Sequence, residues 1–380
     1  METTTALYLH WPFCKHKCPY CDFNSHVAKT IDYTAWEKAY LGELSYFLPY
    51  LQDKTIGSIF FGGGTPSLMP GSVVYTILDW LRRHTRLASD IEITLEANPT
   101  SVESTRFMEY KQAGVNRLSM GIQSLRQEEL HFLGRTHSVD EAKQAIAVAK
   151  LVFDNYSFDL IYARPNQTCD QWHDELTEAL ALAGHHLSLY QLTIEKGTPF
   201  YAAYQKKAFE LPDEETSAQL YTQTNRLMAD KGLLPYEISN YAAAGWECRH
   251  NLQYWQYGDY LGIGPGAHSR ITQAGQKHAM MMIHHPDSWL ASVHQHQHGI
   301  QQQTALSTHE EWEETLMMGL RLSQGIPRAK LERLSGKSLE QSTPAWLISE
   351  GLVTLTAEAL IVTAHGRLLT NAIVSALAVK

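Results

Sequence analysis

The sequence predicts an α/β protein, a partial (βα)6 barrel followed by a smaller, mainly helical C-terminal region that ends in a winged-helix-like module. Two observations support this. In the first half of the 380-residue chain, short apolar runs alternate with longer amphipathic stretches, as in βα units repeated around a parallel sheet. The alternation fades after about Gly197, and six apolar runs are too few for a complete eight-fold barrel.

The six predicted strands are residues 7–10, 58–61, 91–95, 117–120, 157–161 and 187–192. Five helices fit between them, at residues 33–48, 71–83, 101–112, 139–150 and 169–183. Gly114 and Gly184 follow the third and the last of these helices, as expected at helix C-termini. Because parallel strands end at one edge of a sheet, motifs that follow the strands should meet in one site.

The second half predicts two further regions, so that the expected domains are 1–205 (barrel), 206–303 (helical and aromatic) and 304–380 (terminal module). A helix should begin near Pro212, before an aromatic and glycine-rich stretch and a polar one. The terminal module should contain two helices, two short strands at 352–355 and 359–362, and a last helix from Thr363. This order resembles a winged-helix module.

Composition restricts the class of protein. A hydrophobic content of 44% is enough for a large core, and a formal net charge of −9 provides no basic surface for nucleic acid. Five cysteines, three of them in one motif, do not indicate a disulfide framework. No signal peptide and no apolar stretch of about 18 residues is evident. We therefore expect a cytoplasmic protein with neither an integral membrane segment nor a nucleic-acid partner.

Cys14, Cys18 and Cys21 form a C-x3-C-x2-C pattern just after the first strand. A cubane iron–sulfur cluster usually takes one thiolate per iron, so three thiols would leave one of its four irons free for a small molecule. A structural zinc site is the alternative. It would need a fourth ligand, for which His16 and His26 are near enough, but no second C-x2-C pair follows.

The residues around these cysteines narrow the interpretation. With His-Trp-Pro-Phe at 10–13 and Pro-Tyr-Cys-Asp-Phe at 19–23, the pattern resembles the cluster loop of the radical S-adenosylmethionine (SAM) superfamily. The resemblance is to the branch that contains oxygen-independent coproporphyrinogen III oxidases and the HemW haem chaperones. It implies a six-unit barrel, a [4Fe-4S] cluster on the three cysteines, and SAM on the open iron. There, one electron from the cluster would cleave SAM to a 5′-deoxyadenosyl radical.

Further motifs follow the predicted strands. The glycines at 62–64 could let backbone N–H groups approach an anion, although a tight turn would also use them. Glu96 ends a strand, where it could bind hydroxyl or ammonium groups or be an ordinary surface charge. The side chain of Gln123 can bind polar groups of a nucleoside, and that of Arg135 can bind a carboxylate. The resemblance implies SAM contacts from Tyr8, Gly63, Gly64, Thr65, Glu96, Gln123, Arg135 and Asp159.

The chain departs from the family pattern just after Asp159. Residues 163–166 read Ala-Arg-Pro-Asn, where the family commonly has a glycine before Leu-Pro-Gly. This difference predicts a loop of another shape beside an unchanged aspartate.

Two features distinguish the functions within this branch. The oxidases extend the motif to C-x3-C-x2-C-x-C, and this chain has Phe23 at the fourth position. His250, Tyr254 and Trp255 resemble the H-N-x-x-Y-W element associated with haem binding in HemW. Imidazole can ligate haem iron and aromatic rings can stack on a porphyrin. The alternative is a hydrogen-bonded histidine in an aromatic core, and Cys248 beside it is either a ligand or an inert thiol.

These features together predict a haem chaperone that carries the cluster and SAM and transfers haem to an acceptor, such as a respiratory haem protein. The alternative function is an oxygen-independent coproporphyrinogen III oxidase.

His294, His296 and His298, in a glutamine-rich segment, are expected to be solvated. Whether the chain forms a homodimer stays open. The predicted haem-binding residues are His250, Asn251, Tyr254 and Trp255.

Overall fold

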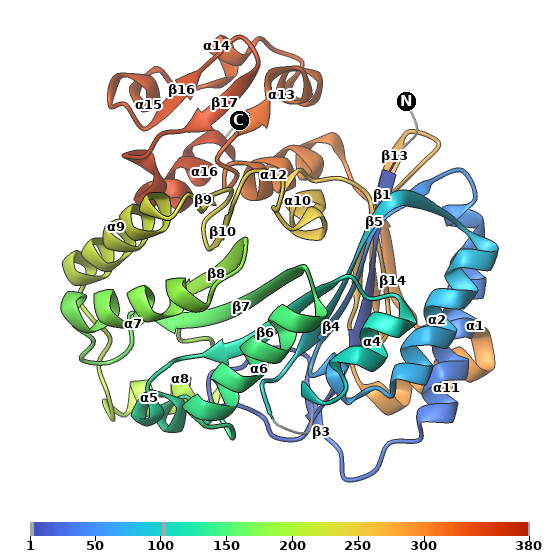
Figure 1. The fold of residues 1–380 in the computed structure, drawn as a ribbon. Helices are drawn as coiled ribbons and strands as arrows, with labels where there is room; N and C mark the ends of the chain where they lie inside the picture. Colours follow the sequence, from blue (N-terminus) through green and yellow to red (C-terminus); the bar gives the residue numbers. More distant parts are fainter. Residues whose placement is uncertain (1–3, 101–103, 379–380) are drawn as a thin grey trace.

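The computed structural model describes residues 4–100 and 104–378. In it, twelve strands form one mixed sheet, in the order β14-β13-β12-β11-β1-β4-β5-β6-β7-β8-β10-β9 (Figure 1). All six predicted barrel strands are present as consecutive parallel neighbours. They are β1 (Thr4–Trp11), β4 (Thr55–Gly63), β5 (Arg86–Ala97), β6 (Arg117–Gln123), β7 (Asn155–Tyr162) and β8 (His186–Gln191).

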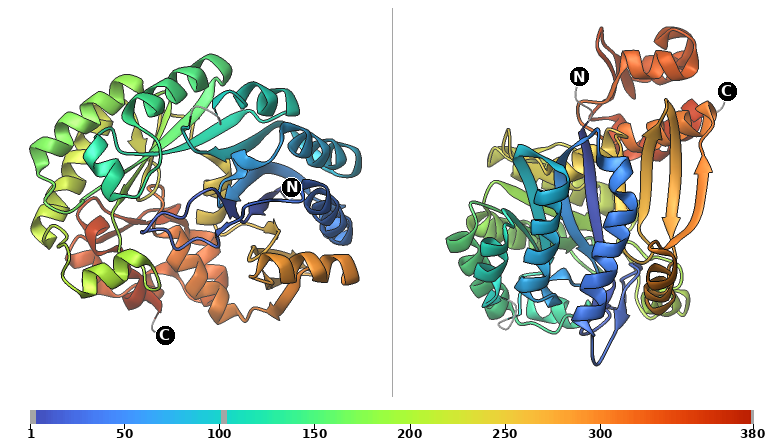
Figure 2. Two further views of the ribbon diagram at one scale, coloured as in Figure 1. Left: turned by 90° about the horizontal axis from the view of Figure 1, so that it is seen from below. Right: turned by 90° about the vertical axis from the view of Figure 1, so that its right-hand side faces the viewer.

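The helices of the first half lie on the outer side of the curved sheet (Figure 2). Capping boxes at Ser138 and Thr168 start two of them, because each side chain accepts a hydrogen bond from the N3 backbone N–H. The first residues of the helix predicted at 101–112 lie outside the described ranges. The outer helices are α1 (Tyr33–Leu51), α2 (Gly71–His84), α4 (Phe107–Ala113), α6 (Val139–Val152) and α7 (Cys169–Leu182), and a short α5 (Gln127–Phe132) follows β6.

Residues 206–303 contain more strand than the sequence predicted. Helix α9 (Glu214–Asp230) begins near the expected position, but β9 (Leu234–Pro235) and β10 (Asn240–Ala242) then extend the sheet beside β8. At the other edge, β11 (Tyr260–Ile263) pairs in parallel with β1, and three antiparallel strands continue from it. These are β12 (His268–Gln273), β13 (Gln276–Met282) and β14 (Ile300–Ala305).

Strand length and polarity explain this difference. Strand β11 is apolar and buried but has only four residues, one of them glycine, and β14 is an edge strand whose polar side chains are almost all exposed. Neither therefore gives the longer apolar run that indicates a buried strand. Two short helices complete the region, α10 (Arg249–Trp255) and α11 (Pro286–His296). His294 and His296 are exposed, as predicted, but they belong to α11 rather than to a loop. His298 is instead half-buried, because its ring packs against Tyr46 and accepts a hydrogen bond from the Ile300 N–H.

The terminal module has a hydrophobic core separate from that of the barrel. Strands β16 (Val353–Leu355) and β17 (Ala359–Val362) form the predicted wing, and β15 (Ile326–Pro327) adds a third strand. Its helices are α12 (Thr308–Gly319), α13 (Arg328–Ser335), α14 (Leu339–Ser342), α15 (Ala345–Ser349) and α16 (Thr370–Ala378). The division at 205 and 303 stays a prediction. No helix within the described ranges is long and apolar enough to span a membrane.

Candidate functional site

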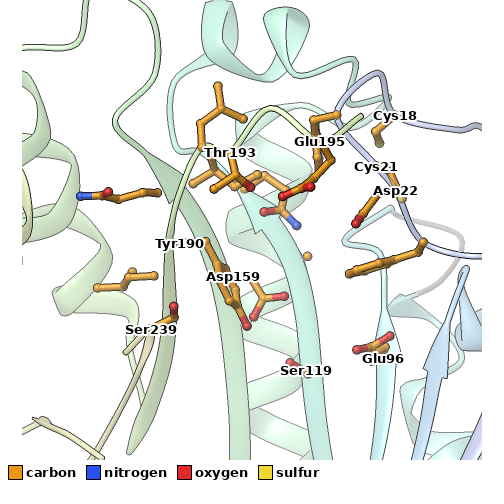
Figure 3. A pocket seen from close by; sticks show the side chains of 18 of the residues that line it. Cys18, Cys21, Asp22, Glu96, Ser119, Asp159, Tyr190, Thr193, Glu195 and Ser239 are labelled. Carbon is orange, nitrogen blue, oxygen red and sulfur yellow. The ribbon is translucent and has the colours of Figure 1, made fainter. Parts of the chain in front are cut away.

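A cavity of about 820 Å³ lies among the carboxyl ends of the barrel strands. One end is formed by the cysteine loop, and strands β4 to β8 contribute the middle of the wall. Figure 3 shows Glu96, Ser119 and Asp159 around this space, with Cys18 and Cys21 at one end. Of the predicted cluster and SAM residues, all except Tyr8 line the cavity.

The three cysteines of the loop are partly buried at the cavity. The Thr65 hydroxyl donates to Cys14 Sγ at 3.3 Å, and Arg135 Nη1 donates to Cys18 Sγ at 3.4 Å. Burial raises the pKa of the Cys14 and Cys21 thiols, while hydrogen bonds oppose that shift. Donors directed at sulfur stabilise thiolates, which are the form that binds iron. The donor set therefore fits a cluster held by these three residues.

A single-ion site has a different geometry, with three or four donors that converge at about 2.0–2.3 Å from the metal. Within residues 4–100 and 104–378, no three His, Cys, Asp or Glu side chains converge in that way. A cubane instead separates its thiolates, since each binds a different iron. The arrangement of Cys14, Cys18 and Cys21 thus fits a cluster better than zinc.

The glycine loop joins the barrel to the cysteine loop. Gly63 has φ +111°, and a Cβ at Gly64 would lie 2.7 Å from the carbonyl oxygen of Phe13. Side chains are therefore excluded here by backbone packing. The Gly63 N–H donates to Glu96 Oε2 at 3.1 Å, and the Gly64 N–H donates to the Trp11 carbonyl at 2.6 Å. Both N–H groups are thus paired within the protein rather than free for an anion.

Two half-buried carboxyl groups, those of Glu96 and Asp159, line the cavity. Burial, and next the charge of Asp159, raises the pKa of Glu96 to about 8. Burial also raises the pKa of Asp159 to about 6, although Arg117 and Arg135 oppose this shift. A cation in the cavity would stabilise the ionised form of both groups. The site is therefore electrostatically suited to a positively charged ligand.

Gln123 ends β6 with φ 72°, a left-handed conformation that is unusual for a residue with a side chain. Its position at the cavity agrees with the prediction. Tyr8 lies elsewhere: its hydroxyl bonds to His10 Nδ1 at 3.0 Å, and its ring stacks on Phe60 inside the barrel. A direct contact between Tyr8 and a ligand in the cavity would require a different side-chain position.

The four predicted haem-binding residues lie on α10, away from the lining of this cavity. The His250 side chain is 1% exposed, with Nδ1 bonded to Ser58 Oγ at 3.1 Å and Nε2 to Tyr254 Oη at 3.2 Å. Burial lowers the pKa of His250 to about 3. Both ring nitrogens are therefore partnered, and the imidazole reaches an external iron only if α10 moves.

Comparison with known proteins places this geometry in a family. Residues 8–179 match the family model of the radical SAM superfamily, and residues 306–369 match that of the HemN C-terminal domain. The chain is 37% identical over 373 residues to the Heme chaperone HemW of Escherichia coli (strain K12), covering 97% of this chain and 96% of that protein. The chain belongs to the HemW branch of the radical SAM superfamily.

A further relative agrees with this assignment, and a solved structure shows the same fold. The mitochondrial Radical S-adenosyl methionine domain-containing protein 1 of Bos taurus is 40% identical over 326 residues, covering 84% of this chain and 74% of that protein. Among solved structures, coproporphyrinogen III oxidase (HemN) from Escherichia coli matches with a TM-score of 0.82 at 22% identity. That match covers 100% of this chain and 91% of that structure, and it establishes the shared fold.

Sequence reasoning missed two residues that organise this radical SAM site. Asn98 accepts from Arg135 Nη2 at 2.6 Å and donates to Thr65 Oγ1 at 3.0 Å, so it links two groups that contact cysteine sulfur. Its place two residues after Glu96, at a strand end, was the available signal. Arg164 lies in the segment that departs from the family pattern, and it is buried in an ion pair with Glu175. Nothing in its local sequence indicated that partner.

Proposed function

We propose that this chain is a haem chaperone, which holds a [4Fe-4S] cluster, SAM and haem and passes haem to an acceptor protein. The observation that carries the proposal is the likeness, over nearly the full length, to relatives named as haem chaperones. Phe23 adds support, because an exposed phenylalanine occupies the position of the fourth cysteine of the oxidases. We also propose a cytoplasmic location and a haem protein, such as a respiratory one, as the acceptor.

Different residues of the cavity have different proposed roles. Cys14, Cys18 and Cys21 would hold the cluster, and Thr65 and Arg135 would stabilise its thiolates. When bound, the cluster and SAM supply one-electron chemistry. The remaining predicted contacts would hold the SAM cation, with Glu96 and Asp159 as half-buried anions that balance its charge.

Haem binding by the α10 residues requires a change in the structure. Because His250 is enclosed by Ser58 and Tyr254, its ligation of haem iron requires displacement of α10. Haem titration of the reconstituted protein should give a Soret band, and His250→Ala should shift or weaken it. His186→Ala is a matched control, since His186 is equally buried and bonds to Ser157 and Tyr236. An unchanged spectrum and affinity in the His250 variant would remove this residue from the site.

An activity assay distinguishes the chaperone from the oxidase. Anaerobically reconstituted protein, supplied with SAM, a reductant and coproporphyrinogen III, should form no protoporphyrinogen. Appreciable product would contradict the chaperone proposal. The fold shared with coproporphyrinogen III oxidase does not favour that activity, because at 22% identity it concerns architecture alone. Size-exclusion chromatography with light scattering would decide whether the chain is a homodimer.

A further inference from the structure

The far wall of the cavity comes from the terminal module. From the cysteine loop the cavity extends past β8 to residues that follow α12 and precede α16. Two of these are arginines, Arg321 and Arg367, and Asn371 lies beside them. One continuous space therefore connects the proposed cluster site with a positively charged surface of another module.

Neither arginine forms an ion pair within 4 Å in the part of the chain that the structure describes, although the charge of the buried Glu237 acts on both. Arg321 donates to the Met317 carbonyl and, at 3.1 Å, to Asn371 Oδ1. Arg367 donates to the carbonyls of Arg321, at 2.7 Å, and Leu322, at 3.0 Å. Burial lowers the pKa of both guanidinium groups, yet arginine keeps its proton in proteins. Partly buried positive charges without an ion pair are costly unless they bind an anion.

The surface between the two ends of the cavity is largely apolar. Leu189, Leu192 and Ile238 contribute to it, together with Tyr190, whose ring stands against the space in Figure 3. A ligand that used this surface and both arginines would combine a broad apolar body with carboxylates at one edge. Ligand sites are commonly apolar with a few placed polar groups, and haem has this shape and these two propionates.

The α10 element provides an independent connection to one of these arginines, Arg321. The Arg321 guanidinium lies 6.0 Å from the ring centre of Trp255, the last residue of the predicted haem-binding motif. Helices α10 and α12 also pack against each other. The motif therefore contacts the terminal module at the position where that module reaches the cavity.

We propose that Arg321 and Arg367 bind the propionate carboxylates of haem, so that the terminal module holds the polar edge of haem in the cavity. This inference rests on the proposed chaperone function and adds to it the residues that recognise the cargo. Charge-assisted, bidentate hydrogen bonds from arginine to carboxylate are among the stronger polar contacts in proteins. Loss of either arginine should weaken haem binding by on the order of 10-fold.

The test compares haem with haem dimethyl ester, whose propionates carry no charge, by titration of the cluster-loaded protein. The wild-type protein should prefer haem by about 10-fold or more. Arg321→Met and Arg367→Met should each reduce this preference. Arg333→Met is the matched control, because Arg333 is an exposed arginine of the same module, on α13, and should leave the preference unchanged.

The outcomes separate this inference from the function on which it rests. No haem binding by the wild-type protein would contradict the chaperone function itself. Equal affinity of the wild-type protein for haem and its ester would overturn the arginine site but not the chaperone function. The same conclusion would follow if Arg333→Met lost as much of the preference for haem as Arg321→Met and Arg367→Met. If a thermal scan shows that Arg367→Met is unfolded, Arg367→Lys replaces it, because lysine keeps the charge. The comparison of haem with its ester on the wild-type protein then still tests whether the propionate charges are recognised.

Discussion

The buried ion pair between Arg164 and Glu175 gives the sharpest prediction about the site. The two side chains are 2% and 1% exposed. Glu175 Oε1 also accepts from the Ser124 hydroxyl at 2.5 Å and from the Leu125 N–H at 2.8 Å, directly after Gln123. We therefore expect Glu175→Gln to destabilise the fold and to release the loop that holds Gln123 in its left-handed conformation.

The magnitude follows from the burial of both charges. Removing one partner of a buried pair typically costs about 3–5 kcal/mol, because the other charge is left uncompensated. Arg164 has a second carboxylate, that of Glu129, at 3.2 Å, which places our expectation at the lower end, about 3 kcal/mol. The double variant Arg164→Met/Glu175→Gln removes both charges and should cost less than Glu175→Gln alone, and the single variant Arg164→Met completes the cycle.

Urea denaturation, followed by circular dichroism, measures these differences as changes in the transition midpoint and slope. The control is Arg83→Met, which breaks an exposed pair with Asp79 and should cost less than about 0.5 kcal/mol. A Glu175→Gln cost below about 1 kcal/mol, or a double-variant cost equal to the sum of the single costs, would refute the reasoning. Weaker SAM binding by Glu175→Gln would show that the pair also supports the cavity.

Three further predictions concern the loop, the cavity and the sheet. Cys18→Ser should lower the iron content after anaerobic reconstitution, measured against protein concentration, whereas iron retained at the wild-type level would mean that the ligands are misassigned. SAM affinity, measured by calorimetry, should rise as pH rises from about 6 to about 8, because Asp159 and then Glu96 ionise. Glu96→Gln should flatten the rise near pH 8. An unchanged pH profile in that variant would contradict the role of Glu96 in SAM binding. Burial raises the pKa of Asp259, but its contacts, chiefly with Lys54, lower it to about 2. Its stabilisation of the fold, present above pH 3.8, should therefore be lost as pH falls towards 2, and Asp259→Asn should remove that part of the acid dependence, worth roughly 2 kcal/mol in a denaturation series.

The barrel could be predicted because its strands are covered on both faces, so that each is a short, continuous run of mostly apolar residues in the sequence. Ser58–Phe61 and Leu187–Leu189 are examples, and both lie within observed strands. The added strands could not be predicted in the same way. Strand β14 has a polar, exposed sequence, and its place in the sheet depends on pairing with β13 rather than on its own residues.

Within the site, the predicted residues that line the cavity belong to the cysteine loop or to segments at the carboxyl ends of the barrel strands. The three cysteines and Glu96 line one cavity, as expected. Arg321 and Arg367 were not predicted, because they approach the cavity only where the terminal module packs against the barrel. The prediction also misjudged the N–H groups of Gly63 and Gly64, since their partners are other parts of the backbone and Glu96.

The two ends of α10, which carries the predicted haem-binding residues, are held differently, and we expect this difference to set the order of haem binding. The first turn of α10 is held inside the barrel, because Glu92 accepts hydrogen bonds from the backbone N–H groups of Arg249 and His250, at 3.2 Å each. Moving α10 would leave the buried Glu92 carboxylate without these donors, at a cost. Trp255, at the other end of the helix, already lies beside Arg321. Haem should therefore bind first through its propionates, and ligation by His250 should follow with movement of α10, so that the arginine variants change affinity while His250→Ala changes the Soret band.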